Sequence, residues 1–291
     1  MTFSGIHVNY PFADTLLLAD YDGKGFPGTF QDYKDRLYLD PAERLAAYSW
    51  LLVCVTVASP LLDSSFVERG VYDGDVFTGM ASVRCSEMGY WNEFAPVFDY
   101  SNITAHADSI QNYVNRGFLR APSELYYPVR LKPPGENNLE TLRACGINHI
   151  ELRMFDLNPL VTAGVDERDV KFAQLMMVWL SSTPKDPFED RDQVQAVQNF
   201  KNAARYDLKT VKILTPVGDT FLAADAALII FDLLRAFYEE LQIDGVKEIL
   251  DFEREKFLNP HVRYAWQIRE EFDGGFAKKA LALAKERQKV V

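Results

Sequence analysis

Three segments alternate apolar and polar residues with the two-residue period of a β-strand: 4–10 ("SGIHVNY"), 125–132 ("LYYPVRLK") and 147–155 ("INHIELRMF"). Alternation gives them apolar faces made of Ile6, Val8 and Tyr10; Leu125, Tyr127, Val129 and Leu131; and Ile150, Leu152 and Met154. The opposite faces are expected to hold His7 and Asn9; Tyr126, Pro128, Arg130 and Lys132; and His149, Glu151, Arg153 and Phe155. The pattern predicts strands with one buried and one polar face.

Most of the remaining chain has the pattern of amphipathic helices. We expect helices at about 30–58, 105–116, 166–182, 190–205, 220–241, 245–258 and 275–289. The stretch 45–62 contains 18 residues without a charge, but it includes polar residues and Pro60, and a membrane span needs about 20 apolar residues. It therefore predicts a buried helix entered at "LDPAE", where Asp40 can cap and Pro41 suits the first helical position.

The order of these elements predicts the domain organisation. Strands fall in the first half of the chain and helices dominate from Asp166 onward, with no repeat, low-complexity segment or linker between them. The segment 59–92 is rich in turn residues and long for a connection within a compact domain, which indicates a functional loop. We expect one α+β domain over 1–291, with the sheet and active-site loops in 1–160 and a mainly helical part in 161–291.

Composition excludes several classes of protein. The 291 residues are 48% hydrophobic and carry a formal net charge of -11, so the chain can bury a core but has no overall positive field for nucleic acid or an anionic membrane. Cys54, Cys85 and Cys145 form no CxxC pair and the histidines have no HExxH spacing, which argues against a disulfide framework or a structural zinc site. Without a recognisable secretory leader, we expect a cytoplasmic protein.

The polar strand faces contain side chains that suit metal and phosphate. If the strands pair, Glu151 and Arg153 come close to Arg130, Lys132 and His7. Carboxylate and imidazole suit a divalent metal, while arginine and lysine suit phosphate. The alternative is a half-exposed antiparallel sheet with cross-strand ion pairs facing solvent. Neither GxxxxGK[ST] nor GxGxxG occurs, so a P-loop or Rossmann nucleotide site is not indicated.

Five motifs give the sequence a resemblance to a known family. "SGIHVNY", "ASPLLDSSF", "ASVRCSEMGYWN", "SELYYPVRLK" and "HIELRMFDLNPLVTAGVDERDVKFAQLMMVWL" resemble, in order and spacing, segments of the bacterial glutamate–cysteine ligases. The resemblance implies a glutamine-synthetase-like fold, in which a curved antiparallel sheet holds ATP and Mg²⁺ or Mn²⁺. It also implies a reaction in which the γ-carboxylate of glutamate is phosphorylated and the cysteine amine then displaces the phosphate, the first step of glutathione biosynthesis.

The resemblance assigns roles to individual residues. Glu151 corresponds to a metal ligand, and His7 resembles the metal-associated histidine of the neighbouring strand. Arg153 corresponds to the residue that neutralises charge on the transferred phosphoryl group, so Glu151 and Arg153 are the implied catalytic pair. Arg130 and Lys132 are implied, with Arg153, as contacts of nucleotide phosphate.

The substrate side of the implied site comes from the loop and the second strand. Arg84 resembles the arginine that binds the glutamate substrate, and Tyr90 and Tyr126 resemble tyrosines that line the cysteine pocket. The implied partners are therefore glutamate, cysteine and ATP, with neither nucleic acid nor a membrane. Considered without the family, His7, Tyr90 and Tyr126 would be assigned to packing or to satisfied hydrogen bonds.

One departure from the family concerns metal ligands. Family members begin with early strands that contain an ExE-like element and a further glutamate, and the sequence here starts at the strand that follows them. We expect this segment to be supplied upstream or by a partner chain. The alternatives are a binding or regulatory relative that does not catalyse, and a related carboxylate–amine ligase that uses another acceptor.

Overall fold

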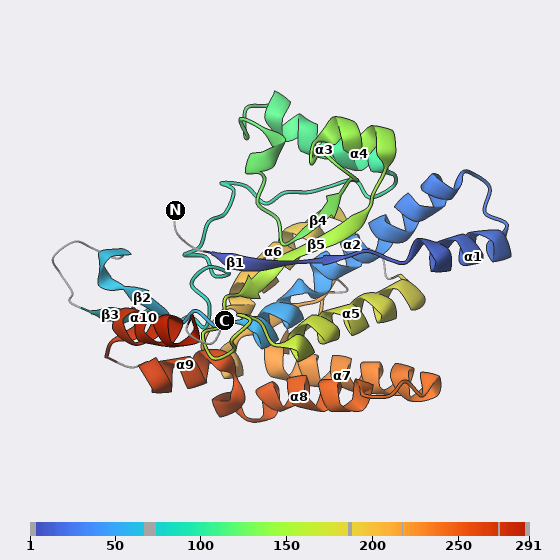
Figure 1. The fold of residues 1–291 in the computed structure, drawn as a ribbon. Helices are drawn as coiled ribbons and strands as arrows, with labels where there is room; N and C mark the ends of the chain where they lie inside the picture. Colours follow the sequence, from blue (N-terminus) through green and yellow to red (C-terminus); the bar gives the residue numbers. More distant parts are fainter. Residues whose placement is uncertain (1–3, 67–73, 186–187, 217, 273, 289–291) are drawn as a thin grey trace.

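A computed structural model describes residues 4–66, 74–185, 188–216, 218–272 and 274–288 (Figure 1). Its strands are β1 (Gly5–Tyr10), β2 (Leu61–Asp63), β3 (Asp75–Phe77), β4 (Val129–Lys132), β5 (His149–Asp156), β6 (Lys212–Leu214) and β7 (Thr220–Leu222). Its α-helices are α1 (Asp14–Lys24), α2 (Phe30–Thr56), α3 (Ile103–Asn115), α4 (Leu139–Cys145), α5 (Glu167–Ser182), α6 (Asp190–Ala203), α7 (Ala223–Leu241), α8 (Val246–Leu258), α9 (Tyr264–Phe272) and α10 (Phe276–Arg287).

The three strands with alternating patterns form one antiparallel sheet in the order β1-β5-β4. Glu151 of β5 stands between Asn9 of β1 and Arg130 of β4. The apolar residues of β5 and β4 are buried, and α2 packs against both strands. The prediction of a sheet with one buried and one polar face is therefore confirmed for these strands.

A β-bulge interrupts the alternation that the sequence predicts for β5. Ile6 pairs with Phe155 and Val8 pairs with Leu152, so that one residue of β1 lies opposite two residues of β5. The extra residue changes the phase of the strand, and Phe155 is fully buried. The expectation that Phe155 shares the polar face of Arg153 is therefore wrong.

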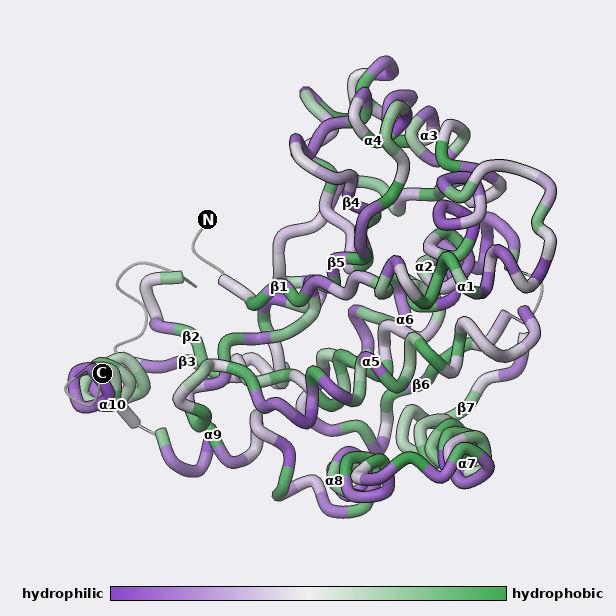
Figure 2. Tube along the Cα trace, turned by 45° about the vertical axis from the view of Figure 1, so that its right-hand side comes forward, coloured by the Kyte–Doolittle hydropathy of each residue, from purple (hydrophilic) through white to green (hydrophobic). Residues whose placement is uncertain are grey.

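The helical part forms layers beneath the sheet. In Figure 1, α5 and α6 flank α2, and α7 and α8 lie below α5, which contacts both of them. Hydrophobic residues are prominent along α7 (Figure 2), and Ala227, Phe231 and Leu234 of this helix are completely buried. At one end, α9 and α10 lie beside the β2–β3 hairpin, and at the other α3 packs on α4. The prediction of an α+β fold is confirmed; the division at residue 160 stays a prediction.

Most of the charge-free stretch, up to Thr56, belongs to α2 and lies in the core, as predicted, while Leu61 and Leu62 belong to β2. Along the described ranges, the structure contains no helix that is long and apolar enough to cross a membrane. The helix does not start at Asp40, however. It begins at Phe30, where the side chain of Thr29 accepts from the Asp32 N–H and the Asp32 carboxylate accepts from the Thr29 N–H. This capping box fixes the start, and Pro41 lies inside the helix.

Short elements account for most other differences. The strand expected at 125–132 is regular only from Val129, because Pro128 has no N–H to donate to a sheet. The predicted loop 59–92 contains β2 and β3, although 67–73 lie outside the described residues. Helices α1 and α9 and the β6–β7 hairpin were not predicted, since three-residue strands and helices with mixed patterns give little periodicity. Asp166 caps α5, as its position in the sequence predicted.

Stability should fall in mild acid because of a buried histidine on α3. His106 is 6% exposed between the rings of Phe98 and Tyr100, and burial lowers its pKa to about 4. The unfolded chain, with an ordinary histidine pKa near 6.5, takes up a proton as the pH falls from 6.5 while the folded chain does not. We expect the free energy of unfolding to fall by about 3 kcal/mol from this group between pH 7 and pH 4.

Urea denaturation at both pH values measures this contribution as a difference between the native chain and a His106→Phe variant. The phenylalanine ring suits the aromatic surroundings and does not titrate. The native chain should lose more stability than the variant on acidification. An equal loss in both proteins would contradict the assignment.

Candidate functional site

Glu151 is the centre of a group of charged side chains on the polar face of the sheet. Its Oε2 atom lies 3.5 Å from Lys132 Nζ and 3.7 Å from His7 Nδ1, and its Oε1 atom lies 3.7 Å from Arg153 Nε. The residues come from all three strands, because the antiparallel register places Arg130 directly opposite Glu151. The sheet thus brings together the five residues that sequence analysis proposed for metal and phosphate.

The site has more positive than negative charge. Arg130, Lys132 and Arg153 surround one carboxylate, and burial followed by repulsion from Arg153 lowers the pKa of Arg130 to about 10. Burial also lowers the pKa of Lys132, which is partly offset by Glu151. Cations held this close together repel one another, and an anionic ligand would relieve that repulsion. This arrangement favours phosphate binding over the alternative of a sheet with simple cross-strand ion pairs.

Arg153 has a guanidinium N–H without a hydrogen-bond partner in the described part of the chain. Its Nε atom is buried and has no hydrogen-bond partner among the described residues, since Glu151 is beyond hydrogen-bonding distance. The guanidinium carbon lies 5.3 Å from the centre of the Tyr126 ring, a distance typical of a cation–π contact. Arg153 lies at the β-bulge, which determines the direction of its side chain. Bulges often change side-chain directions beside functional sites.

His7 is the β1 residue that lies beside Glu151. Its side chain is 42% exposed, and burial followed by the charge of Arg153 lowers its pKa, which favours the neutral imidazole. Over the described ranges, no group of three or more His, Cys, Asp or Glu side chains is placed to hold a metal. The carboxylate of Glu151 is the kind of oxygen ligand that magnesium takes, and the metal roles of Glu151 and His7 stay predictions.

The predicted substrate residues form a second group next to Arg153. Arg84 Nη1 lies 3.4 Å from the hydroxyl of Tyr126, and the rings of Tyr90 and Tyr126 meet edge to face with their centres 6.0 Å apart. Trp91 also contacts the Tyr126 ring, at 5.2 Å. Tyr90 is 46% exposed, so this group opens to solvent. The structure brings these residues together, and their individual roles stay predictions.

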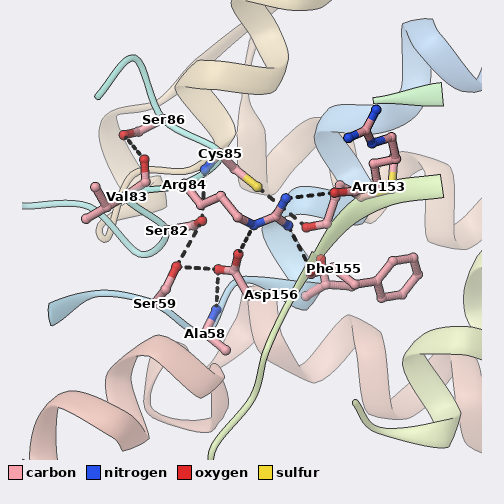
Figure 3. Close-up of polar contacts among 12 residues, drawn as sticks. Ala58, Ser59, Ser82, Val83, Arg84, Cys85, Ser86, Arg153, Phe155 and Asp156 are labelled. Carbon is pink, nitrogen blue, oxygen red and sulfur yellow. Dashed lines mark hydrogen bonds and ion pairs between the residues drawn. The ribbon is translucent and has the colours of Figure 1, made fainter. Parts of the chain in front are cut away.

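Arg84 is tied closely to the end of β5 (Figure 3). It donates from Nη1 to the carbonyl of Arg153 at 2.8 Å, from Nη2 to the carbonyl of Phe155 at 2.8 Å, and from Nε to Asp156 at 2.9 Å. Sequence analysis did not identify Asp156 or Trp91. Asp156 comes directly after the strand predicted at 147–155 and is the last residue of the observed β5. A carboxylate at the buried end of that strand was the only sign in the sequence that it has a special role.

A family model described as glutamate–cysteine ligase matches residues 1–97 and 94–203 of the chain. A bifunctional glutathione biosynthesis protein from Listeria welshimeri is 31% identical over 279 residues, which cover 92% of this chain and 36% of that protein. The corresponding protein from Pasteurella multocida is 26% identical and is covered to 33%. The chain thus spans about a third of the length of these curated relatives.

Solved structures share the fold. A glutamate–cysteine ligase from Francisella tularensis, determined in complex with AMP, superposes with a TM-score of 0.83 over 98% of this chain and 63% of that chain, at 19% identity. A bifunctional glutathione synthetase from Pasteurella multocida has a TM-score of 0.79 over 97% of this chain and 36% of its own length, at 20% identity. At these identities the superpositions establish the architecture.

Proposed function

Because the chain belongs to the glutamate–cysteine ligase family, we propose that it contributes the phosphoryl-transfer and amino-acid sites of an ATP-dependent ligase that joins L-glutamate to L-cysteine, the first step of glutathione biosynthesis. The observation that supports this most directly is the meeting of Glu151 with Arg130, Lys132 and Arg153 on one face of the sheet. The Francisella tularensis ligase of the same fold was solved in complex with AMP, which supports an adenine nucleotide as a ligand of this chain.

The reaction has two steps. A γ-carboxylate oxygen of glutamate attacks the γ-phosphorus of ATP, which forms γ-glutamyl phosphate and releases ADP. The cysteine amine then attacks the acyl carbon, inorganic phosphate leaves, and the amine loses a proton. Both steps develop negative charge on phosphate oxygens, so fixed cations are the main contribution that the protein can make.

Arg153 would stabilise that charge, because its guanidinium lies on the polar face beside Glu151. Arg130 and Lys132 would bind the phosphates that do not react. Glu151 and His7 would hold a magnesium ion, which when bound neutralises phosphate charge and orients the phosphoryl group. A magnesium ion held by two protein donors would also need phosphate oxygens, water or further carboxylates, and we propose that an additional segment or a partner chain supplies the carboxylates.

The amino-acid substrates would bind beside the phosphoryl site. Tyr90 and Tyr126 offer aromatic faces and hydroxyl groups, and the buried Arg84 guanidinium behind the Tyr126 hydroxyl would add positive charge for a substrate carboxylate. Since Arg153 stacks on Tyr126, the phosphorylated carboxyl and the attacking amine would meet near this ring. We place the reaction in the cytoplasm.

ADP release by the purified chain, measured with Mg-ATP, glutamate and cysteine and with each amino acid omitted in turn, tests the function. With the family's N-terminal segment supplied, we expect turnover that requires glutamate, with full turnover only when cysteine is also present. Faster turnover with an amine that lacks a thiol would favour a different carboxylate–amine ligase. Ligand-induced stabilisation without ADP formation, even with the family's N-terminal segment supplied, would instead identify a binding protein.

A further inference from the structure

Asp156, the last residue of β5, has a carboxylate that is fully engaged by the protein. It is 2% exposed, and its Oδ1 atom accepts from Arg84 Nε at 2.9 Å. Its Oδ2 atom accepts from the Ala58 N–H at 3.0 Å and from the Ser59 hydroxyl at 2.7 Å (Figure 3). These contacts direct both oxygens inward, so Asp156 is not available to bind a substrate itself.

The contacts of Asp156 fix the plane of the Arg84 guanidinium. Nη1 and Nη2 donate to the carbonyls of Arg153 and Phe155, while Nε is held by Asp156. Gly5 of β1 closes the remaining side, because a Cβ atom at this position would lie only 2.5 Å from the guanidinium carbon. A cation enclosed in this way keeps one orientation, and that orientation directs Nη1 toward the Tyr126 hydroxyl at 3.4 Å.

We propose that Asp156 is a positioning residue, which acts through Arg84 to hold the amino-acid pocket beside the phosphoryl site. The expected effect on the KM of an amino-acid substrate rests on the proposed function. The orientation of Arg84 by Asp156 does not depend on that function. Arg84 contacts the backbone of Arg153 and the hydroxyl of Tyr126 at the same time. A change in the direction of its guanidinium would therefore disturb the pocket before it disturbs the nucleotide phosphates.

An amide cannot replace the carboxylate at this position. Asp156 accepts a hydrogen bond at each oxygen, and the donors include the fixed N–H of Ala58. An asparagine would have to turn its NH₂ group toward either Ala58 or Arg84, which opposes two donors. Asp156→Asn should therefore release Arg84 while it preserves the size of the side chain, which makes it the variant of choice.

Steady-state kinetics in the ADP assay test the proposal. For Asp156→Asn we expect the KM of an amino-acid substrate to rise by about tenfold to a hundredfold, with the KM of ATP changed by less than about threefold. In an Arg84→Ala background, the added Asp156→Asn substitution should have little further effect on that KM, because the partner through which it acts is absent. Multiplicative effects of the two substitutions, or an equal rise in the KM of ATP, would overturn the proposal.

Two further variants keep the kinetic test interpretable if Asp156→Asn folds poorly. Ser59→Ala removes one hydrogen bond to Asp156 and should raise the same KM several-fold. Asp166→Asn provides the matched control. Asp166 also pairs with an arginine, Arg168 at the start of α5, and the substitution should leave both KM values unchanged. A change in the control equal to that of Ser59→Ala would count against a specific role for Asp156.

NMR of the arginine Nε–H groups gives a readout that does not depend on turnover. The Arg84 Nε–H donates to a buried carboxylate, so its signal should exchange slowly with solvent and disappear in Arg84→Lys, which assigns it. We expect fast exchange of this signal in Asp156→Asn and slow exchange in Asp166→Asn. Slow exchange in Asp156→Asn would overturn the geometric claim. Absence of turnover even with the family's N-terminal segment supplied, together with the expected NMR result, would instead refute the proposed function alone.

Discussion

Glu151→Gln is expected to lower ATP turnover with glutamate and cysteine by at least about a hundredfold while the chain remains folded. The substitution keeps the shape of the side chain but removes the only negative charge among His7, Lys132 and Arg153 at distances of 3.5 to 3.7 Å. The amide is a poor magnesium ligand compared with a carboxylate. The cations of the site are then left without a counter-charge, so ATP binding without metal should become tighter rather than weaker.

This opposite response of binding and turnover distinguishes a metal ligand from a residue that only holds the sheet together. ADP release as a function of magnesium concentration, and ATP binding with and without magnesium, measure the two effects. Glu140→Gln on the exposed face of α4 makes the same chemical change away from the site and should behave as the native chain does. Unchanged turnover in Glu151→Gln would refute the metal assignment.

The polar face of the sheet could be predicted because it depends on local information. Alternation placed Glu151 and Arg153 on one side of their strand and Arg130 and Lys132 on one side of theirs, and pairing of the two strands then brings the four together. The same rule failed at Phe155, because a β-bulge changes which face of the sheet the following side chains occupy. The bulge cannot be recognised from the sequence of that strand alone.

Asp156 could not be predicted, since its role depends on contacts between distant parts of the chain. Its partners Ala58, Ser59 and Arg84 lie 72 to 98 positions away in sequence. Periodicity describes neighbours within one element and says nothing about which loop a buried carboxylate will meet. The family resemblance identified Arg84, because it compares whole motifs. Alternation could not identify Arg84, because it describes only neighbours within one strand.

A buried charged cluster beneath α2 also joins distant parts of the chain, so periodicity could not predict it. We expect this cluster to have a large effect on stability. Lys256 Nζ lies 2.8 Å from Asp169 Oδ1 and 2.7 Å from Glu253 Oε2, and it donates to the carbonyl of Val55 at 2.9 Å. Glu253 is completely buried, and burial raises its pKa well above the ordinary value despite the nearby Lys256. Lys256 thus lies between two carboxyl groups, and burial favours the protonated form of Glu253.

Lys256→Met should therefore reduce the free energy of unfolding by about 3 to 5 kcal/mol, because it leaves a buried carboxylate without its cation. Urea denaturation at pH 7 measures the loss, and Lys247→Met on the exposed side of the same helix is the matched control, with little expected change. Glu253→Gln should be nearly neutral at pH 5, because burial raises the pKa of Glu253 and so favours its protonated form in the folded chain.

The pH dependence of Glu253→Gln separates the two carboxyl groups of the cluster. The unfolded chain releases the Glu253 proton above about pH 4.5, whereas the folded chain retains it, so this group makes the native protein less stable as the pH rises. The glutamine variant lacks that penalty and should exceed the native chain in stability at pH 8. If it is instead destabilised at pH 8 as strongly as Lys256→Met, then Glu253 is ionised in the folded state and the cluster is held by two ion pairs.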